Sequence, residues 1–397
     1  DEKAHIPAAY SSVRYGDMRL NPEHPPLIKD FSGLFLLPLG LDFPLESGEW
    51  RDGFNEQWAV GDMFINCTRP EIACNDADTI LFFSRLPIII LSVFLGAVIF
   101  LWTRRLAGAL GGVIATTLYA ADPNIIAHNH YVTTDIGSAT FIFLAFYFFI
   151  RFLKSPSSRT ILLAGIFLGL AELTKFSAVL LFPVFGLFTL LFALTCPQEQ
   201  QDWRAKLRTA FSNVSRFLFG YAGIVLICFV IIWIGYALNT LGMPAQKVVE
   251  HADLFLSQPN TPAQVTHDLI VSMTQSPLLL PYAEYFVGIA KVFSRVAAGN
   301  VHYFLGTVSV DASPWYFPVV FVLKSTLPFL ILLVITMLYG IFRILSATRR
   351  QTMGLPALFA RSFQNNITEY LCVFFILFYS YVSITGNLTI GFRHLFP

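Results

Sequence analysis

Long apolar stretches alternate along this chain with short polar segments. A transmembrane helix needs about 20 mostly apolar residues. The polar sequence AELTKFS interrupts an apolar stretch, 160–195, that is too long for one helix, so we expect two spans there. The pattern predicts an all-α polytopic membrane protein with eight spans in total. Their ranges are 79–102, 107–121, 136–153, two within 160–195, 217–238, 316–345 and 367–384.

Basic residues gather in alternate loops between these spans, and this asymmetry predicts the side of the membrane that each loop occupies. Short loops rich in Lys and Arg stay in the cytoplasm. The basic loops contain Arg104, Arg105, Arg151, Lys154, Arg159, the segment DWRAKLR, Arg216, Arg343, Arg349, Arg350 and Arg361. The loops between them are acidic or mixed and are expected outside, at 1–78, 122–135, the turn near Lys175, 239–315 and 385–397.

This sidedness divides the chain into four parts. Residues 1–78 form a first extracytoplasmic loop, 79–238 hold membrane spans, 239–315 form a long extracytoplasmic loop, and 316–397 hold spans that end in an extracytoplasmic segment. Because residue 1 then lies outside, we expect a further span before it. The chain begins DEKAH without Met and stops at GFRHLFP, so we expect a fragment that lacks the first span and the C-terminal end.

The composition agrees with a membrane protein. Of the 397 residues, 55% are hydrophobic and 13% are charged, whereas soluble domains carry about 25% charged residues. The net charge is +1, and the sequence has no basic stripe of the kind that nucleic acid requires. We therefore expect the lipid bilayer, and no nucleic acid, among the partners.

The first loop has two local features. The sequence FSGLFLLPLGL is apolar but only about 11 residues long, which is too short to span and is typical of a helix lying in the membrane interface. Cys67 and Cys74 stand close together in CTRPEIAC. Outside the cytoplasm such a pair persists as a disulfide, which we expect here, with two free thiols as the alternative.

Polar clusters recur at the helix ends that are expected outside. They are DEKAH, NPEHPPLIKD, AADPNIIAHNHYVTTD, ELTKF and GNLTIGFRH. Because each is attached to a span end on the same side, we expect them to meet in one extracytoplasmic site. That site would combine carboxylates, cations and imidazoles, from Asp1, Asp135, Lys29, Lys175, Arg393, His24, His128, His130 and His394. A base takes a proton from a hydroxyl and cations stabilise a departing phosphate, so the mixture suits transfer from a lipid-linked phosphate donor.

The segment DEKAHIPAAYSSVRYGDMRLNPEHPPLIK resembles the first outer loop of membrane glycosyltransferases with the GT-C fold. The likeness is to the protein O-mannosyltransferases and their bacterial relatives, including the aminoarabinose transferases of lipid A. It depends on the acidic pair, the PPL, the later TTD, and GFRHLFP, which is similar to the family's G-x-R-Y-L-x-P. The resemblance implies a GT-C type helical bundle with interfacial helices in the first loop. It also implies inverting transfer of a mannose-like or related sugar from a polyprenyl-phosphate donor to an acceptor hydroxyl, as in protein O-linked glycosylation.

The resemblance further implies catalytic roles for three acidic residues. Asp1 would be the base that takes the proton of the acceptor hydroxyl, with Glu2 as its companion. Asp135 would be a second acidic residue near the site. Asp135 also has a structural alternative, because Asp is a favoured N-cap residue and a helix is expected to begin at IGSATFIF.

The expected substrate-binding residues are basic. His24 stands where some relatives have Lys before PP, so Lys29 is an alternative contact for the donor phosphate. Arg393 and His394 match the family's Arg-Tyr pair, with His in place of Tyr, and Arg393 would bind phosphate unless it is a plain surface residue. Lys175 either contributes to the site or extends its ammonium to the membrane surface.

Two questions stay open at this stage. The sequence HNH offers His128 and His130, with Asp1 and Asp135, as weak candidate ligands of a divalent metal, although the polarity of an outer loop explains them as well. The alternative functions are a transporter or flippase of lipid-linked sugars and a lipid-linked polysaccharide ligase. A transporter places ionisable residues near the bilayer midplane, whereas here they gather at one surface, which favours the enzyme. We expect a bacterial inner-membrane protein whose acceptor is a protein, a lipid or a glycan.

Overall fold

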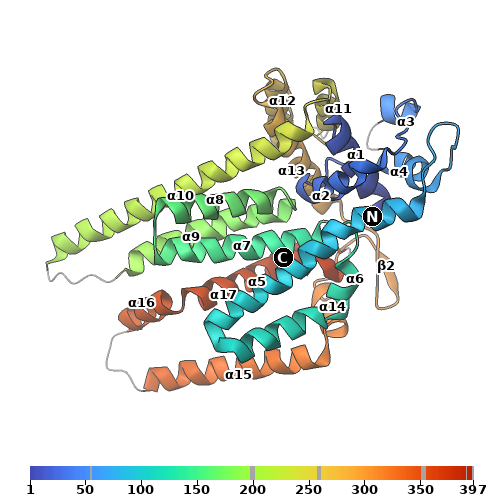
Figure 1. Ribbon diagram of the computed structural model, residues 1–397. Helices are drawn as coiled ribbons and strands as arrows, with labels where there is room; N and C mark the ends of the chain where they lie inside the picture. The colour runs from blue at the N-terminus through green and yellow to red at the C-terminus, as the bar shows by residue number, and fades with distance from the viewer. Residues whose placement is uncertain (54–55, 197–201, 257–260, 350–354, 390, 396–397) are drawn as a thin grey trace.

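The computed structural model describes residues 1–53, 56–196, 202–256, 261–349, 355–389 and 391–395, and these are mostly helical. Long helices run side by side and form the body of the molecule (Figure 1). They are α5 (Ala77–Ala120), α7 (Asp135–Lys154), α8 (Ser158–Glu172), α9 (Leu181–Thr195), α10 (Trp203–Asn239), α15 (Leu327–Arg349) and α17 (Ile367–Thr385). One antiparallel hairpin, β1 (His302–Phe304) with β2 (Thr307–Ser309), lies among the described residues. The all-α class predicted from the sequence is confirmed.

Shorter elements gather at one end of this bundle, which we call the loop end (Figure 1). They are α1 (Glu2–Tyr15), α2 (Leu27–Leu36), η1 (Leu37–Leu39), α3 (Gly48–Arg51), α4 (Gln57–Asn66), α6 (Pro123–His128), η2 (Phe176–Leu180), α11 (Ala245–Leu256), α12 (Thr261–Thr274), α13 (Leu280–Ala298), α14 (Tyr316–Lys324) and η3 (Phe392–Leu395). α16 (Leu355–Asn365) lies at the opposite end. The segments expected outside the membrane therefore lie together at the loop end.

Five described helices are long and apolar enough to cross a membrane, or six if the bent pair α14 and α15 counts as one span. α5 is 44 residues long, and it accommodates the two expected spans 79–102 and 107–121. Its helical path breaks at Gly108, whose φ of 76° favours glycine, and the chain turns back there (Figure 1). α8 has 15 residues, which is shorter than the about 20 of a full span. Helices therefore occupy all eight expected ranges, but α8 and the part of α5 after Gly108 are each shorter than a full span.

The expected span 316–345 is divided in the structure. α14 and α15 meet at a bend of 115°. Ser325 between them is extended, with φ −79° and ψ 147°, and Pro328 stands in the first turn of α15, where its missing N–H leaves no intrahelical bond unmade. A hydropathy window cannot detect this bend, because the residues on both sides of it are equally apolar.

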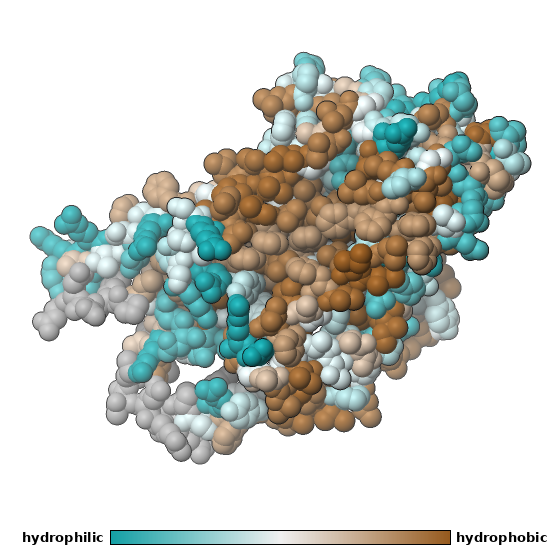
Figure 2. Space-filling view, in the orientation of Figure 1, coloured by the Kyte–Doolittle hydropathy of each residue, from teal (hydrophilic) through white to brown (hydrophobic). Residues whose placement is uncertain are grey.

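Apolar side chains cover the outside of the bundle. Figure 2 shows them over the middle of the molecule, with hydrophilic side chains at both ends. On α10, Phe219 is 79% exposed and Leu226 is 68% exposed, and on α17 Leu377 is 65% exposed. Soluble monomers rarely expose such large contiguous apolar surfaces, so this belt faces lipid. The chain is an integral, multi-pass membrane protein.

The first loop is a packed layer of helices. α2 and η1 occupy the apolar sequence expected in the interface, and Leu34 is 52% exposed there. α1 crosses α2 so closely that a Cβ on Gly33 would overlap the carbonyl oxygen of Ala9. The loop is further closed by a disulfide between Cys67 and Cys74. This layer holds the start of α1 in a fixed position at the loop end.

α1 and α2 are also tied to the spans by a buried polar cluster. The Asp30 carboxylate accepts hydrogen bonds from Ser12 Oγ at 3.1 Å and from Asn239 Nδ2, at the end of α10, at 2.8 Å. Burial raises the pKa of Asp30 to about 6, although both hydrogen bonds oppose the shift. The cluster therefore fixes the first loop against α10.

Candidate functional site

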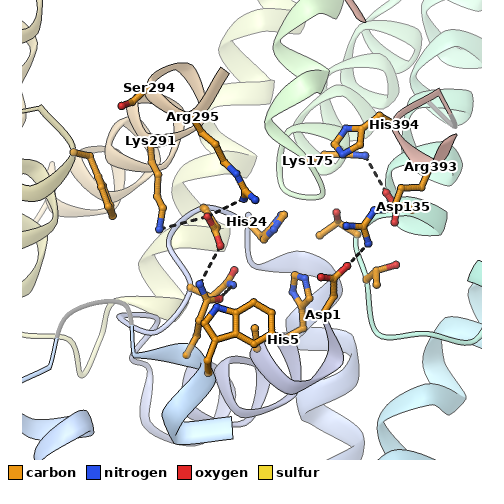
Figure 3. A pocket seen from close by; sticks show the side chains of 18 of the residues that line it. Asp1, His5, His24, Asp135, Lys175, Lys291, Ser294, Arg295, Arg393 and His394 are labelled. Atoms are coloured by element: carbon orange, nitrogen blue, oxygen red, sulfur yellow. Dashed lines mark hydrogen bonds and ion pairs between the residues drawn. The ribbon is translucent and has the colours of Figure 1, made fainter. Parts of the chain in front are cut away.

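A cavity of about 440 Å³ opens at the loop end. Its walls come from segments far apart in the sequence, namely the start of α1, the loop 21–24, the start of α4, the residues 133–135 at the start of α7, Lys175, α11, α13 and η3. Figure 3 shows their charged side chains pointing toward one another. The expected site residues that line this cavity are Asp1, His24, Asp135, Lys175, Arg393 and His394. The prediction that distant polar segments converge therefore agrees with the arrangement in the structure.

Two carboxylate–cation pairs stand on one side of the cavity. Asp1 accepts a hydrogen bond from Arg393 in η3, which brings the two ends of the chain together. Asp135 is only 4% exposed, and its Oδ1 accepts a bond of 3.0 Å from Lys175 Nζ. Thr134, rather than Asp135, is the N-cap of α7. The Asp135 carboxylate is thus engaged with Lys175, and the alternative of a simple helix cap is not supported.

Glu2 does not line the cavity. Its carboxylate accepts a 2.9 Å bond from Arg85 Nε on α5 and a 3.1 Å bond from the backbone N–H of Val132. These bonds join the start of α1 to α5 and to the loop that leads to Asp135. Glu2 therefore positions the walls, whereas the sequence placed it as a companion of the base.

Lys29 also differs from the expectation that it contacts phosphate. Its side chain is buried, and its ammonium donates to the carbonyl oxygens of Asn21 and His24, at 2.8 Å in each case. Burial lowers the pKa of Lys29 to about 8, despite the neighbouring carboxylates. Lys29 supports the loop 21–24 from beneath, and it is not among the residues that line the cavity.

The imidazoles at the cavity are neutral near pH 7. Burial lowers the pKa of His5 and of His394 to about 3, and nearby cations add to the effect. Burial likewise holds the pKa of His24 well below its usual value, with further contributions from His5 and Lys29. The His5 and His24 rings lie 4.7 Å apart. His24 and His394 can therefore offer hydrogen bonds to a substrate, but neither supplies a positive charge for phosphate.

A second group of charges, on the opposite side of the cavity, was missed by the sequence analysis. Lys291 and Arg295 project from α13, and Glu23 lies between them, with its Oε2 3.4 Å from Lys291 Nζ and 3.3 Å from Arg295 Nη1. Burial disfavours the charged form of Glu23, but Lys291, Gln57 and Arg295 outweigh it and lower the pKa of Glu23. The sequence contains a signal for this pair, because Lys291 and Arg295 are four residues apart and therefore share one face of a helix.

The metal candidates form no recognisable site. His128 ends α6 and His130 follows it, and neither lines the cavity. Among the described residues, no group of three or more His, Cys, Asp or Glu side chains is arranged to hold a metal ion. Nothing in the arrangement therefore joins these two histidines to Asp1 and Asp135 as a ligand set.

The charges of the cavity suit an anionic ligand. Four cations and three carboxylates line it, so with neutral imidazoles the lining carries a net charge of +1. The cations are Lys175, Lys291, Arg295 and Arg393, and the carboxylates belong to Asp1, Glu23 and Asp135. A phosphate would be attracted to the cations, and a carboxylate facing the same space is available as a base. The arrangement can therefore support displacement of a phosphate by a hydroxyl.

Comparison with known protein families gives a match to part of the chain. Residues 79–233 match the model of the dolichyl-phosphate-mannose-protein mannosyltransferase family. No curated protein and no solved structure matches the chain. Of the charged residues at the cavity, Asp135 and Lys175 fall within the matched segment. Together with the helical bundle, the match supports a membrane glycosyltransferase similar to mannosyltransferases, with a bundle of the GT-C type.

Proposed function

We propose that this protein transfers a sugar from a polyprenyl-phosphate donor to an acceptor hydroxyl at the extracytoplasmic surface of a membrane, with inversion at the anomeric carbon. The main support for the proposal is one arrangement. Asp1, the candidate base, and the cations Lys291 and Arg295 face each other across one cavity at the loop end of the apolar bundle. A lipid-linked donor can reach such a cavity from the bilayer while its sugar lies among polar side chains.

Asp1 is the proposed base. Its carboxylate is partly exposed to the cavity, with 37% of the side chain accessible, and Arg393 holds its orientation. An ionised carboxylate in this place can accept the proton of a hydroxyl. Asp135 is far more buried and is bound to Lys175, so it is less accessible to an acceptor hydroxyl. The Asp135–Lys175 pair instead offers an acceptor and donors to the hydroxyl groups of the sugar.

Lys291 and Arg295 are the proposed ligands of the donor phosphate. In an inverting displacement the acceptor attacks from the face opposite to the leaving group, so the base and the phosphate ligands must lie on opposite sides of the sugar. The α13 cations lie across the cavity from Asp1 (Figure 3). Charge-assisted hydrogen bonds from them would stabilise the negative charge that accumulates on the departing phosphate.

The test uses the full-length protein in proteoliposomes with radiolabelled polyprenyl-phosphate mannose. Loss of a general base typically slows a reaction about 100- to 10 000-fold, so Asp1→Asn should reduce transfer by that order. Asp62→Asn is the matched control, because Asp62 is also paired with a cation at the loop end but lies outside the cavity. Equal transfer by Asp1→Asn and wild type would remove Asp1 from its role. Movement of the donor across the bilayer without any transfer would favour a transporter.

A further inference from the structure

Two apolar grooves flank α13. The first, the α12 groove, lies between α13 and the helices α11 and α12, has a volume of about 620 Å³, and includes Leu269, Ile270 and Phe286. The second, the α17 groove, lies between α13, α14, α17 and η2, has a volume of about 200 Å³, and includes Val292 and Val382. Ile289 and Phe293 on α13 line both grooves, so this helix separates them.

The helix that separates the grooves, α13, begins beside the apolar part of α10 and ends at the polar cavity. At the start of α13, Tyr282 donates a hydrogen bond of 3.1 Å to the carbonyl oxygen of Phe229, and Trp233 Nε1 donates one of 2.8 Å to the carbonyl oxygen of Leu278. At about 1.5 Å per residue, Phe229 lies about 15 Å from the loop end of α10, within its apolar part. The last residues of α13 line the cavity. Part of the loop 239–315, expected wholly outside, therefore lies beside a span.

The grooves enter the cavity on opposite sides. The α12 groove shares Phe255, Ser294 and Ala298 with the cavity, beside Lys291 and Arg295. The α17 groove shares His394 with it, next to the Arg393 that holds Asp1. Figure 3 shows Lys291, Ser294 and Arg295 on one side, Asp1, Arg393 and His394 on the other, and His24 between them. The α12 groove thus leads to the proposed phosphate ligands, and the α17 groove leads to the proposed base.

The polyprenyl chain of the donor would occupy one of the two grooves. If its phosphate lies at Lys291 and Arg295, its polyprenyl chain lies in the α12 groove, whose larger volume suits a methyl-branched chain. The α17 groove then leads to the base, where the acceptor hydroxyl must lie. A polar peptide or a free glycan would gain nothing from that apolar path, whereas a hydrocarbon chain gains about 0.8 kcal/mol per buried methylene.

We infer that the acceptor is an amphiphile, with a hydroxylated headgroup at Asp1 and a hydrocarbon chain in the α17 groove. This inference rests on the proposed function. In the reaction, the headgroup oxygen bonds to the anomeric carbon as the bond between that carbon and the phosphate oxygen breaks. The proton of the hydroxyl passes to the Asp1 carboxylate, and the polyprenyl phosphate leaves with the electron pair. Both substrates and the glycosylated product therefore remain in the membrane.

The experiment identifies the acceptor class without knowing the acceptor. Membranes that contain the full-length protein are incubated with radiolabelled polyprenyl-phosphate mannose, the remaining donor is cleaved by mild acid, and the label is partitioned between organic solvent and the protein pellet. We expect the new label in the organic phase. Val382→Trp, which narrows the α17 groove, should reduce the initial rate of label transfer into lipid at least tenfold at a fixed donor concentration. Val373→Trp, on the same helix but 56% exposed and outside this groove, is the control and should behave as wild type.

The outcomes separate this inference from the proposed function. Label in the protein pellet would overturn the amphiphilic acceptor and leave the glycosyltransferase intact. An absence of new label in both phases would overturn the proposed function, and the inference with it. If Val382→Trp transfers label to lipid as well as Val373→Trp does, the α17 groove is not the path of the acceptor. Ala297→Trp, in the α12 groove, should raise the KM for the donor, which Val382→Trp should leave unchanged.

Discussion

Replacing Lys291 by methionine should weaken binding of the donor and also slow the transfer step, because the ammonium is proposed both to bind the phosphate and to stabilise it as it leaves. The Lys291 ammonium lies at the cavity with 11% of its side chain exposed, next to Glu23 and 4.4 Å from the centre of the Phe255 ring. Methionine keeps most of the aliphatic length and the contact with Phe255, but removes the charge. The net charge of the cavity lining then falls from +1 to zero, because three cations face three carboxylates.

The size of the effect follows from the burial of the cation. A hydrogen bond to a charged group contributes about 1.5–3 kcal/mol net, and about 1.4 kcal/mol corresponds to a tenfold change in affinity. We therefore expect the donor KM to rise about 10- to 100-fold in Lys291→Met. Arg295 is 42% exposed, and solvent screens exposed charges, so Arg295→Met should raise the donor KM by less than about tenfold. The structure therefore predicts a larger rise in the donor KM for Lys291→Met than for Arg295→Met.

A double variant separates the loss of a phosphate ligand from the exposure of Glu23. Lys291→Met leaves Glu23 with Arg295 as its remaining α13 partner, so part of the loss is repulsion between Glu23 and phosphate. Adding Glu23→Gln restores the net charge of +1 and should recover part of the donor affinity. Steady-state transfer with varied donor gives KM and kcat for each variant. Arg14→Met, which removes an exposed charge from α1 outside the cavity, is the control. An unchanged donor KM together with an unchanged kcat in Lys291→Met would refute phosphate binding at α13.

Three further predictions concern the walls of the site. A Cβ on Gly288 would lie 2.6 Å from the carbonyl oxygen of Pro22 and would overlap the Phe176 ring, so Gly288→Ala should displace α13 and raise the donor KM several-fold, whereas Gly340→Ala, where the space is open, should leave it unchanged. His5 and His394 have a pKa of about 3 in the folded protein, whereas the pKa in the unfolded chain is near 6.5, so stability should fall as the pH drops from about 6.5 toward 3. The raised pKa of Asp30 should offset only part of this loss. His394→Gln should therefore flatten the dependence of the thermal midpoint on pH. Replacing Cys67 and Cys74 together by serine should cost about 2 kcal/mol for so short a loop, and a reducing agent should lower the thermal midpoint of the wild type while leaving the double variant unchanged.

The sequence predicted the fold well where a bilayer restricts the backbone conformations that a segment can adopt. A chain in hydrocarbon must satisfy its backbone hydrogen bonds internally, so a long apolar run is a helix, and the ranges 79–102, 136–153, 217–238 and 367–384 are helical in the structure. The turn-back at Gly108 was anticipated from Arg104 and Arg105, which end one apolar run before the next begins. The break between α14 and α15 was not anticipated, because it depends on local backbone geometry within a uniformly apolar stretch.

The site was predicted in part, for a related reason. Topology alone places the ends of alternate spans on one side, so the meeting of Asp1, Asp135, Lys175 and Arg393 followed from counting spans. Topology does not determine which way a side chain points at the ends of the spans. Lys29 therefore appeared equivalent to the others, although it is turned inward to bind backbone carbonyls.

α13 was overlooked because its amphipathic sequence lies within an expected loop, where hydropathy gives no reason to expect a helix that packs against a span. Yet this helix carries Lys291 and Arg295, separates the two apolar grooves, and lies outside the segment 79–233 that matches the mannosyltransferase family. The matched segment supplies Asp135 and Lys175, which in our proposal contact the sugar. On that division, the matched spans provide the residues proposed to contact the sugar, whereas the proposed base and phosphate ligands lie outside the matched segment. The surrounding elements, α13 and α17 above all, then determine which lipids enter from either side, so exchange of α13 between relatives should change the preferred lipid and not the sugar.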